Sequence, residues 1–498
     1  MRAVLRLVSR FGLAAFLLGL AVAGSPSPGL ADPPAEHGTR LPPSQLEKHT
    51  EIEAVRLGDL IQAPAVLPFV LMLLAIAIMP LAAGHWWEKN SHKAIVAALL
   101  SVPVIIYMLA RGGHDGLHEL FHKVEEYVSF LALLGALFVI SGGIHVQGSL
   151  AGTPLVNTGM LAFGAFLANL VGTTGASMLL VRPLLTANQS RRNKGHVFVF
   201  FIFVVSNCGG LLTPLGDPPL FLGFLNGVPF EWTLRLWPQW AVVNGLLLVI
   251  FNIWDQIVLD REEKSRPGSQ LEEVMEHQPL RVLGLHNLLF LLGIVVTVYG
   301  AGRGLGNGGQ PWPFGVQEGC MIALALAAYF STKPDIRQRN RFGMGPIVEV
   351  AVLFAGIFVT MTPALLILNV RGSEMGVEAP WHFFWASGAL SSFLDNAPTY
   401  LTFAATACGM EGVPLAGRYL EALLAQPAAH GAAEILAAIS CGSVFMGANT
   451  YIGNGPNFMV KAIAEENGVS MPGFFGYMAY SGAVLIPLFI LVTFLFFR

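Results

Sequence analysis

The sequence predicts an all-α polytopic membrane protein made of two inverted repeats, each with about five transmembrane helices and one re-entrant helical hairpin. Its composition is 54% hydrophobic and 12% charged, whereas a soluble protein carries about 25% charged residues. Many apolar runs reach the roughly 20 residues that a spanning helix needs. Polar breaks also interrupt these runs at matching places in the two halves. Together these observations leave no room for a soluble catalytic domain.

The polar breaks are the most informative part of the chain. The first half has them at 169–175 and 206–219, and the second half at 391–399 and 447–457. In hydrocarbon an unpaired backbone group costs several kcal/mol, so non-helical backbone persists only where it is buried in protein or lines a watery cavity. Interrupted helices at corresponding places in two halves indicate the binding site of a secondary transporter.

The N-terminus has the pattern of a secretory signal peptide. Arg2, Arg6 and Arg10 are followed by an apolar stretch at 11–23 and a small-residue cleavage site at 29–31. We therefore expect a cleaved signal peptide at 1–31, a periplasmic segment at 32–62 and a location in the bacterial inner membrane. An uncleaved first helix is the alternative.

Apolar runs predict the spanning segments in order. They lie near 64–84, 94–110, 127–144, 196–225, 235–257, 282–300, 313–331, 346–369, 433–462 and 473–497. Two further stretches, 154–181 and 381–407, are too long for one ordinary span and have polar residues at their middles. We interpret both as hairpins that enter and leave the membrane on the same side.

The distribution of basic residues supports the hairpin interpretation. With residues 32–62 outside and a hairpin at 154–181, three basic clusters fall on the cytoplasmic side, as the positive-inside rule requires. These clusters are Arg182, Arg191, Arg192 and Lys194; Arg261, Lys264, Arg266 and Arg281; and Lys333, Arg337, Arg339 and Arg341. A single crossing at 154–181 would turn the later clusters outward. The count predicts a first repeat at 63–257, a cytoplasmic linker at 258–281 and a second repeat at 282–498 that begins on the opposite side.

Two carboxylates, Asp217 and Asp395, lie deep in the apolar stretches, and no Lys or Arg lies at comparable depth. Intramembrane carboxylates are costly and are functional candidates by default. Carboxylate and broken-helix carbonyl oxygens suit Na⁺. The structural alternatives are a helix cap for Asp395 and a cap or turn for Asp217.

Neutral oxygen donors accompany these acids within the breaks. For each one the alternative is a side chain that satisfies freed helix backbone. They are Asn169, Thr173, Thr174, Asn207, Asn396, Thr399, Asn449, Asn454 and Asn457. Glu349 is a further proton-coupling candidate, with a first-turn interfacial carboxylate as its alternative.

Other side chains do not indicate a metal or disulfide site. His114, His118 and His122 repeat every four residues beside Asp115 and Glu119. That spacing occurs in zinc sites, but a wet amphipathic segment leading into the third span explains it better. The four cysteines lack metal-ligand spacing and predict neither a disulfide framework nor a zinc site.

Four segments resemble the ion-transporter superfamily, which includes arsenite efflux permeases, citrate and dicarboxylate carriers and D-type bacterial sodium/proton antiporters. They are 173–183, 206–219, 395–399 and 453–457. The combination is most similar to bacterial membrane proteins labelled sodium/proton antiporters or citrate transporters, and it covers nearly the whole chain after residue 60.

The resemblance implies two hairpins that meet near the midplane, with an ion site between each tip and the neighbouring interrupted helix. The first site would use Thr173, Thr174 and the 207–217 break. The second would use Asp395, Asn396, Thr399 and the 449–457 break. Sodium-coupled dicarboxylate carriers of the superfamily have Ser-Asn-Thr at their tips, whereas this chain has Gly-Thr-Thr-Gly and Asp-Asn-Ala-Pro-Thr.

The leading functional hypothesis is sodium/proton antiport by alternating access, in which Asp395 and secondarily Asp217 exchange H⁺ for Na⁺. Sodium-coupled symport of citrate or a dicarboxylate is the second hypothesis, and efflux of arsenite or another oxyanion is the third. The sequence shows no nucleophile–base pairing that would indicate an enzyme. The expected partners are the lipid bilayer and a small ion or carboxylate, with no cofactor, no nucleic acid and, by analogy with related carriers, a homodimer.

Overall fold

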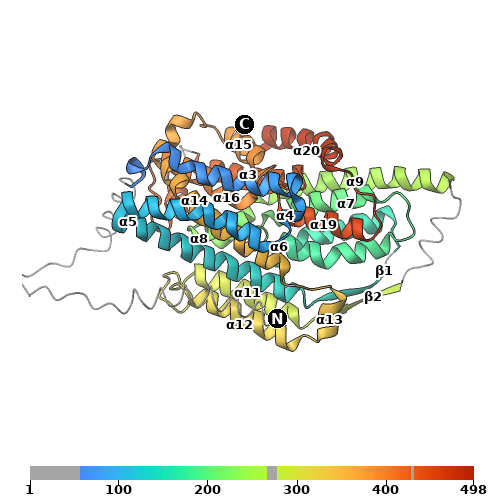
Figure 1. Cartoon of the computed structure of the whole chain (residues 1–498). Helices are drawn as coiled ribbons and strands as arrows, with labels where there is room; N and C mark the ends of the chain where they lie inside the picture. Colours follow the sequence, from blue (N-terminus) through green and yellow to red (C-terminus); the bar gives the residue numbers. More distant parts are fainter. Residues whose placement is uncertain (1–56, 150, 266–277, 428–430) are drawn as a thin grey trace, which may run out of the picture. The chain divides into compact units, whose positions relative to one another are not determined.

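A computed structural model describes residues 57–149, 151–265, 278–427 and 431–498 (Figure 1). The chain divides into two units, Met1–Glu47 and Lys48–Arg498, and all described residues belong to the second. The predicted signal peptide at 1–31 and most of the 32–62 segment lie outside the described residues.

Helices dominate the second unit, and seven of those in the described ranges are long and apolar enough to cross a membrane. The predicted class, an all-α polytopic membrane protein, is therefore confirmed. The helices are α3 (Leu67–Ala82), α4 (Gly84–Trp87), α5 (Asn90–Ser141), α6 (Pro154–Ala187), α7 (Gly195–Val204), α8 (Pro218–Leu225), α9 (Trp237–Ser265), α11 (Asn287–Gly302), α12 (Val316–Ser331), α13 (Pro334–Arg339), α14 (Gly345–Arg371), α15 (Pro380–Ser391), α16 (Asn396–Met410), α17 (Tyr419–Leu424), α18 (Ala432–Met446), α19 (Gly455–Glu466) and α20 (Phe474–Phe496).

Helix α5 contains two limbs joined by a sharp turn. Gly113 has φ 54° and ψ −123°, which is not helical. A Cβ placed on Gly116 would contact the carbonyl oxygen of Met108, although eight residues of straight helix would separate the two by about 12 Å. The chain therefore folds back at Gly113, and the limbs correspond to the runs at 94–110 and 127–144. In Figure 1, α11 and α12 lie beside the second limb.

Helix α6 folds back in the same way at Gly172, whose φ of 77° suits glycine. The amides of Asn157 and Asn188, 31 positions apart, donate to each other at 2.9 and 2.8 Å. As a straight helix this stretch would keep them about 46 Å apart. The two limbs are thus antiparallel, with their open end closed by the paired amides and their tip at 172–174.

The second polar hairpin has a clearer break. Helix α15 ends at Ser391 and α16 begins at Asn396. The rings of Phe383 and Phe403 pack edge to face across the two helices, with centroids 6.5 Å apart. The tip of this hairpin is therefore the short segment 392–395.

Each half also has an interrupted helix. In the first, α7 is followed by η2 (Cys208–Leu211), an irregular stretch and α8. In the second, α18 is followed by η6 (Gly447–Asn449), an irregular stretch and α19. Every residue of α7 from His196 to Val204 is buried, so this broken helix is surrounded by protein, as its free backbone groups require.

The two interrupted helices have matching backbone geometry. Asp217 and Asn454, 237 positions apart, each precede the second helical piece with extended φ/ψ of −144°/145° and −149°/143°. A Cβ on Gly216 would overlap the carbonyl oxygen of Gly210, and one on Gly453 would overlap that of Gly447 at the slightly longer distance of 2.5 Å. Both breaks therefore require glycine at the same point of the same turn.

A short antiparallel pair of strands, β1 (His145–Ser149) and β2 (Gln278–Leu283), joins the two halves. The sequence predicted neither strand. The linker expected at 258–281 also differs from a simple loop, because α9 continues to Ser265 and β2 begins at Gln278. Each strand forms because it pairs with a segment far away in the sequence, and no local sequence pattern predicts that pairing.

A buried ionic cluster attaches the open end of the α6 hairpin to α9. Asp255 is fully buried and lies 2.6 Å from Arg191 Nη1 and 2.8 Å from His196 Nε2. Its second oxygen accepts from Asn157 Nδ2 at 2.9 Å. The base of the first hairpin is therefore held by charged and amide contacts that are costly to break, because each group is buried in protein.

Candidate functional site

The tip of the first hairpin is hydrogen-bonded to the first interrupted helix. Thr173 N donates to the carbonyl oxygen of Gly216 at 2.8 Å, and Thr173 Oγ1 donates to Asp217 Oδ1 at 2.8 Å. The turn at Gly172 orients this threonine, because the second limb of α6 starts immediately after it. Thr173 thus links the tip to both the backbone and the side chain of the break.

Asp217 is the centre of the site. It stands at the N-cap position of α8 but makes no capping hydrogen bond to that helix. Its carboxylate instead accepts from Thr173, from Asn396 Nδ2 at 2.8 Å and from Asn454 Nδ2 at 3.4 Å. The residue is 1% exposed. Its three donors come from the first hairpin, the second hairpin and the second interrupted helix, and all three are neutral.

Asparagine side chains extend the contact between the two interrupted helices. Asn207 Nδ2 donates to Asn457 Oδ1 at 2.7 Å, and Asn454 Nδ2 approaches Asn207 Oδ1 and the carbonyl oxygen of Ser206 at 3.1 Å each. Because an amide group has only two hydrogens, Asn454 cannot satisfy these two acceptors and Asp217 at the same time. The contact to Asp217 is the longest of the three and is therefore the weakest hydrogen bond.

The second hairpin contributes Asn396 and Asp395 in different ways. Asn396 donates to Asp217, while its own Oδ1 accepts from Ser391 Oγ at 2.6 Å. Asp395 Oδ1 accepts from the backbone nitrogen of Ala397 at 3.1 Å, so it caps the start of α16. Thr399 donates back to the carbonyl oxygen of Asp395 at 3.0 Å.

The second interrupted helix has its own contacts with the second hairpin. Asn449 Nδ2 donates to Ser392 Oγ at 2.9 Å, and Thr450 Oγ1 donates to the carbonyl oxygen of Ser392. The buried oxygens Asn449 Oδ1 and Ser443 Oγ have no hydrogen-bond partner among the described residues. In the first half the same is true of Asn244 Oδ1, whose amide nitrogen donates to the carbonyl oxygen of Cys208 at 3.1 Å. Such oxygens are suited to a cation ligand role.

Neither acid of the site has a positively charged partner among the residues that the structure describes. Within the described ranges, no ion pair includes Asp217 or Asp395. A cavity of about 60 Å³ reaches Asp217 between the first hairpin tip, α5 and the start of α14. Apart from Thr173, Thr174 and Asp217, its lining is glycine, proline and apolar side chains. The carboxylate is therefore placed to attract a cation or a proton.

The structure brings six of the predicted residues into one hydrogen-bonded network. They are Thr173, Asn207, Asp217, Asn396, Asn454 and Asn457. Thr174 lines the small cavity beside Thr173. Asp395, Thr399 and Asn449 lie on the second hairpin and its neighbouring break, outside the contacts to Asp217.

Glu349 lies apart from the network. It pairs with Lys93 Nζ at 2.7 Å, and its side chain is 45% exposed whereas that of Lys93 is 4% exposed. This pair joins the first limb of α5 to α14. Glu349 therefore pairs with a buried lysine, and within the described residues it has no hydrogen bond or ion pair to the Asp217 network.

Several serines in the network were not singled out as site residues. Ser391 contacts both Asn396 and the carbonyl oxygen of Ser443 at 2.6 Å, and Ser177 and Ser206 hydroxyls lie 2.8 Å apart. Ser206 and Ser443 occupy equivalent positions before the two breaks. This equivalence is the sequence pattern that could have identified them as site residues. A serine in an apolar helix usually hydrogen-bonds to the backbone of its own helix, so its presence alone does not predict a site.

A family model described as putative citrate transport matches residues 59–497, which contain the whole site. A search of curated proteins gave no match. The matched region contains both hairpins, both interrupted helices and the Asp217 network. The chain therefore belongs to the putative citrate transport family, a group of citrate transporter-like ion transporters, and is a multi-pass membrane protein of the secondary-transporter class.

Proposed function

We propose that the protein exchanges Na⁺ for H⁺ by alternating access, with Asp217 as the principal ion-binding carboxylate. The observation that carries this proposal is a buried carboxylate that three neutral donors hold between both halves of the chain. A proton or a Na⁺ ion neutralises this charge, and each competes with the other for the same oxygens. That competition is the basis of antiport.

Contacts to Asp217 from three other segments support coupling between ion binding and movement. Occupation of the carboxylate by a cation weakens its hydrogen bonds to Thr173, Asn396 and Asn454, because those donors are attracted to the negative charge. Each of these side chains belongs to a different hairpin or helix piece. Ion binding thus changes how tightly the hairpins are held against the interrupted helices.

Asp395 provides a second carboxylate in this proposal. One of its oxygens caps α16, and the other has no hydrogen bond to a described side chain. Together with Asn449 Oδ1 and Ser443 Oγ, the second half offers oxygen ligands of the kind that suit Na⁺. The second hairpin is accordingly proposed as the auxiliary ion site.

Sodium-coupled citrate symport is the second candidate, and the family match favours it. A tricarboxylate in the Asp217 cavity would lie beside a carboxylate with no Lys or Arg in the lining. The lack of a basic side chain in this lining supports a small cation over the tricarboxylate at this position.

The test is purified protein in liposomes with an imposed pH gradient that a pH-sensitive dye reports. We expect Na⁺ or Li⁺ added outside to dissipate the gradient, while citrate without Na⁺ has no effect. If Na⁺ and Li⁺ leave the gradient intact, and labelled citrate accumulates only with Na⁺, the symport function replaces the antiport function.

A further inference from the structure

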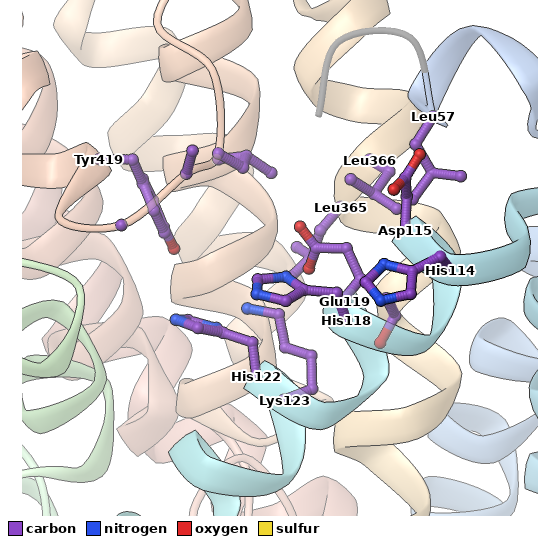
Figure 2. Close-up of a pocket in the computed structure, with 14 residues that line it drawn as sticks. Leu57, His114, Asp115, His118, Glu119, His122, Lys123, Leu365, Leu366 and Tyr419 are labelled. Atoms are coloured by element: carbon purple, nitrogen blue, oxygen red, sulfur yellow. The ribbon is translucent and has the colours of Figure 1, made fainter. Parts of the chain in front are cut away.

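A second cavity, of about 220 Å³, lies away from the Asp217 network and shares no lining residue with the smaller cavity. It is formed by α5 just after the Gly113 turn, by α14 and by the segment before α17. Its charged and histidine lining consists of His114, Asp115, His118, Glu119, His122 and Lys123, with Tyr419 on the facing wall (Figure 2). The transport proposal uses none of these residues.

His118 and His122 form a pair on one face of the second limb of α5. Residues four positions apart on a helix are neighbours, with Cβ atoms about 5–6 Å apart. Figure 2 shows both imidazole rings turned toward the same cavity. The stretch His118-Glu119-Leu120-Phe121-His122 matches the arrangement in which two helical histidines bind one zinc ion.

A buried carboxylate orients His122. The Nδ1 atom of His122 lies 3.3 Å from Glu126 Oε1, and the Glu126 side chain is 5% exposed. Lys123 Nζ holds that carboxylate through contacts of 2.9 and 3.0 Å with its two oxygens. Histidines that ligate metals commonly direct their second ring nitrogen to a carboxylate, which fixes the ring and leaves the other nitrogen available. In this geometry His122 Nε2 is the available nitrogen.

We propose that His118 and His122 bind a divalent transition-metal cation of the Zn²⁺ or Ni²⁺ class in this cavity. In the described ranges, no group of three or more His, Cys, Asp or Glu side chains is placed to hold a metal ion. The site therefore has two imidazole ligands, with water in the remaining positions. Imidazole ligands favour these cations over Mg²⁺ and Ca²⁺, which prefer oxygen. Asp115 and Glu119 add negative charge at the cavity wall.

The experiment is calorimetric titration of Zn²⁺ into the purified full-length protein in detergent, in a buffer free of chelating anions. We expect saturable binding of one Zn²⁺ that excess Mg²⁺ does not displace. His118→Ala or His122→Ala should weaken it at least about tenfold. Glu126→Gln should weaken it by about 10–100-fold, the usual effect of removing a carboxylate behind a ligating histidine.

His114→Ala is the matched control, because His114 lines the same cavity but lies eight positions from His122, about 12 Å along a helix axis. We expect Zn²⁺ affinity within about threefold of wild type in that variant. Three outcomes overturn the proposal: no saturable Zn²⁺ binding, unchanged binding in both His118→Ala and His122→Ala, or a loss in His114→Ala that exceeds the loss in His122→Ala. Circular dichroism of each variant confirms that its helical content is retained. None of these readouts depends on transport.

Discussion

Asp217→Asn tests the charge of the site while it keeps the hydrogen bonds that hold the site together. It removes the negative charge and replaces one carboxylate oxygen by an NH₂ donor. If the remaining oxygen faces Thr173 and Asn454, the new NH₂ group faces Asn396. Rotation of the Asn396 amide then presents its oxygen to that group and its NH₂ to Ser391. Ser391 Oγ can accept there while donating to the carbonyl oxygen of Ser443, 2.6 Å away.

This rearrangement keeps every buried polar group paired, so the cost to stability is small. Hydrogen bonds to charged groups are worth about 1.5–3 kcal/mol and neutral ones about 0.5–1.5 kcal/mol. The two contacts to Asp217 at 2.8 Å thus lose about 1–2 kcal/mol each, and release from the cost of burying a charge offsets that loss. Asp217→Ala allows no such rearrangement. Thr173 Oγ1 and Asn396 Nδ2 both lose their acceptor, at about 1–3 kcal/mol each.

We therefore expect Asp217→Asn to melt close to the wild-type temperature in detergent, and Asp217→Ala to melt clearly lower. Both variants should reduce Na⁺-dependent dissipation of a pH gradient to the level of protein-free liposomes. Near-normal exchange by Asp217→Asn would refute the role of this carboxylate. A melting temperature of Asp217→Asn as low as that of Asp217→Ala would refute the hydrogen-bond argument.

Three further substitutions test other parts of the account. Asp395→Asn keeps the α16 cap, since Asn caps as well as Asp, and should lose exchange without loss of thermal stability; unimpaired exchange in liposomes would make Asp395 a cap only. Gly216→Ala forces a Cβ against the carbonyl oxygen of Gly210 and should destabilise the protein by about 1–3 kcal/mol. Its control is Gly455→Ala, which meets nothing within 4 Å; equal melting temperatures for the two would contradict the close approach. Asp255→Asn leaves a buried arginine uncompensated and should cost about 3–5 kcal/mol, so an unchanged melting curve would remove the ionic cluster as an anchor of the first hairpin.

The sequence predicted most of the helical segments because hydropathy determines them directly. The runs at 94–110 and 127–144 correspond to the two limbs of α5, and the break at Gly172 falls within the hairpin expected at 154–181. The strands β1 and β2 were not predicted, because their pairing joins residues more than a hundred positions apart and neither is long or regularly patterned.

From the sequence we ranked Asp395 above Asp217, and the proposed function reverses that order. In the sequence both acids lie within apolar stretches, and each precedes helix-starting residues. Only the fold reveals that Asp395 caps its own helix while Asp217 turns away from α8 toward three other segments. Contacts between Asn207 and Asn457, 250 positions apart, depend on how the two halves meet and leave no local pattern.

The most direct test of the central claim is equilibrium binding of radioactive Na⁺ to the purified protein at several pH values. The account predicts saturable binding that weakens as the pH falls, since a carboxylate must be deprotonated to hold the cation. It also predicts that Asp217→Asn abolishes this binding while the protein remains folded. Binding that is independent of pH, or that persists at full strength in Asp217→Asn, would contradict it.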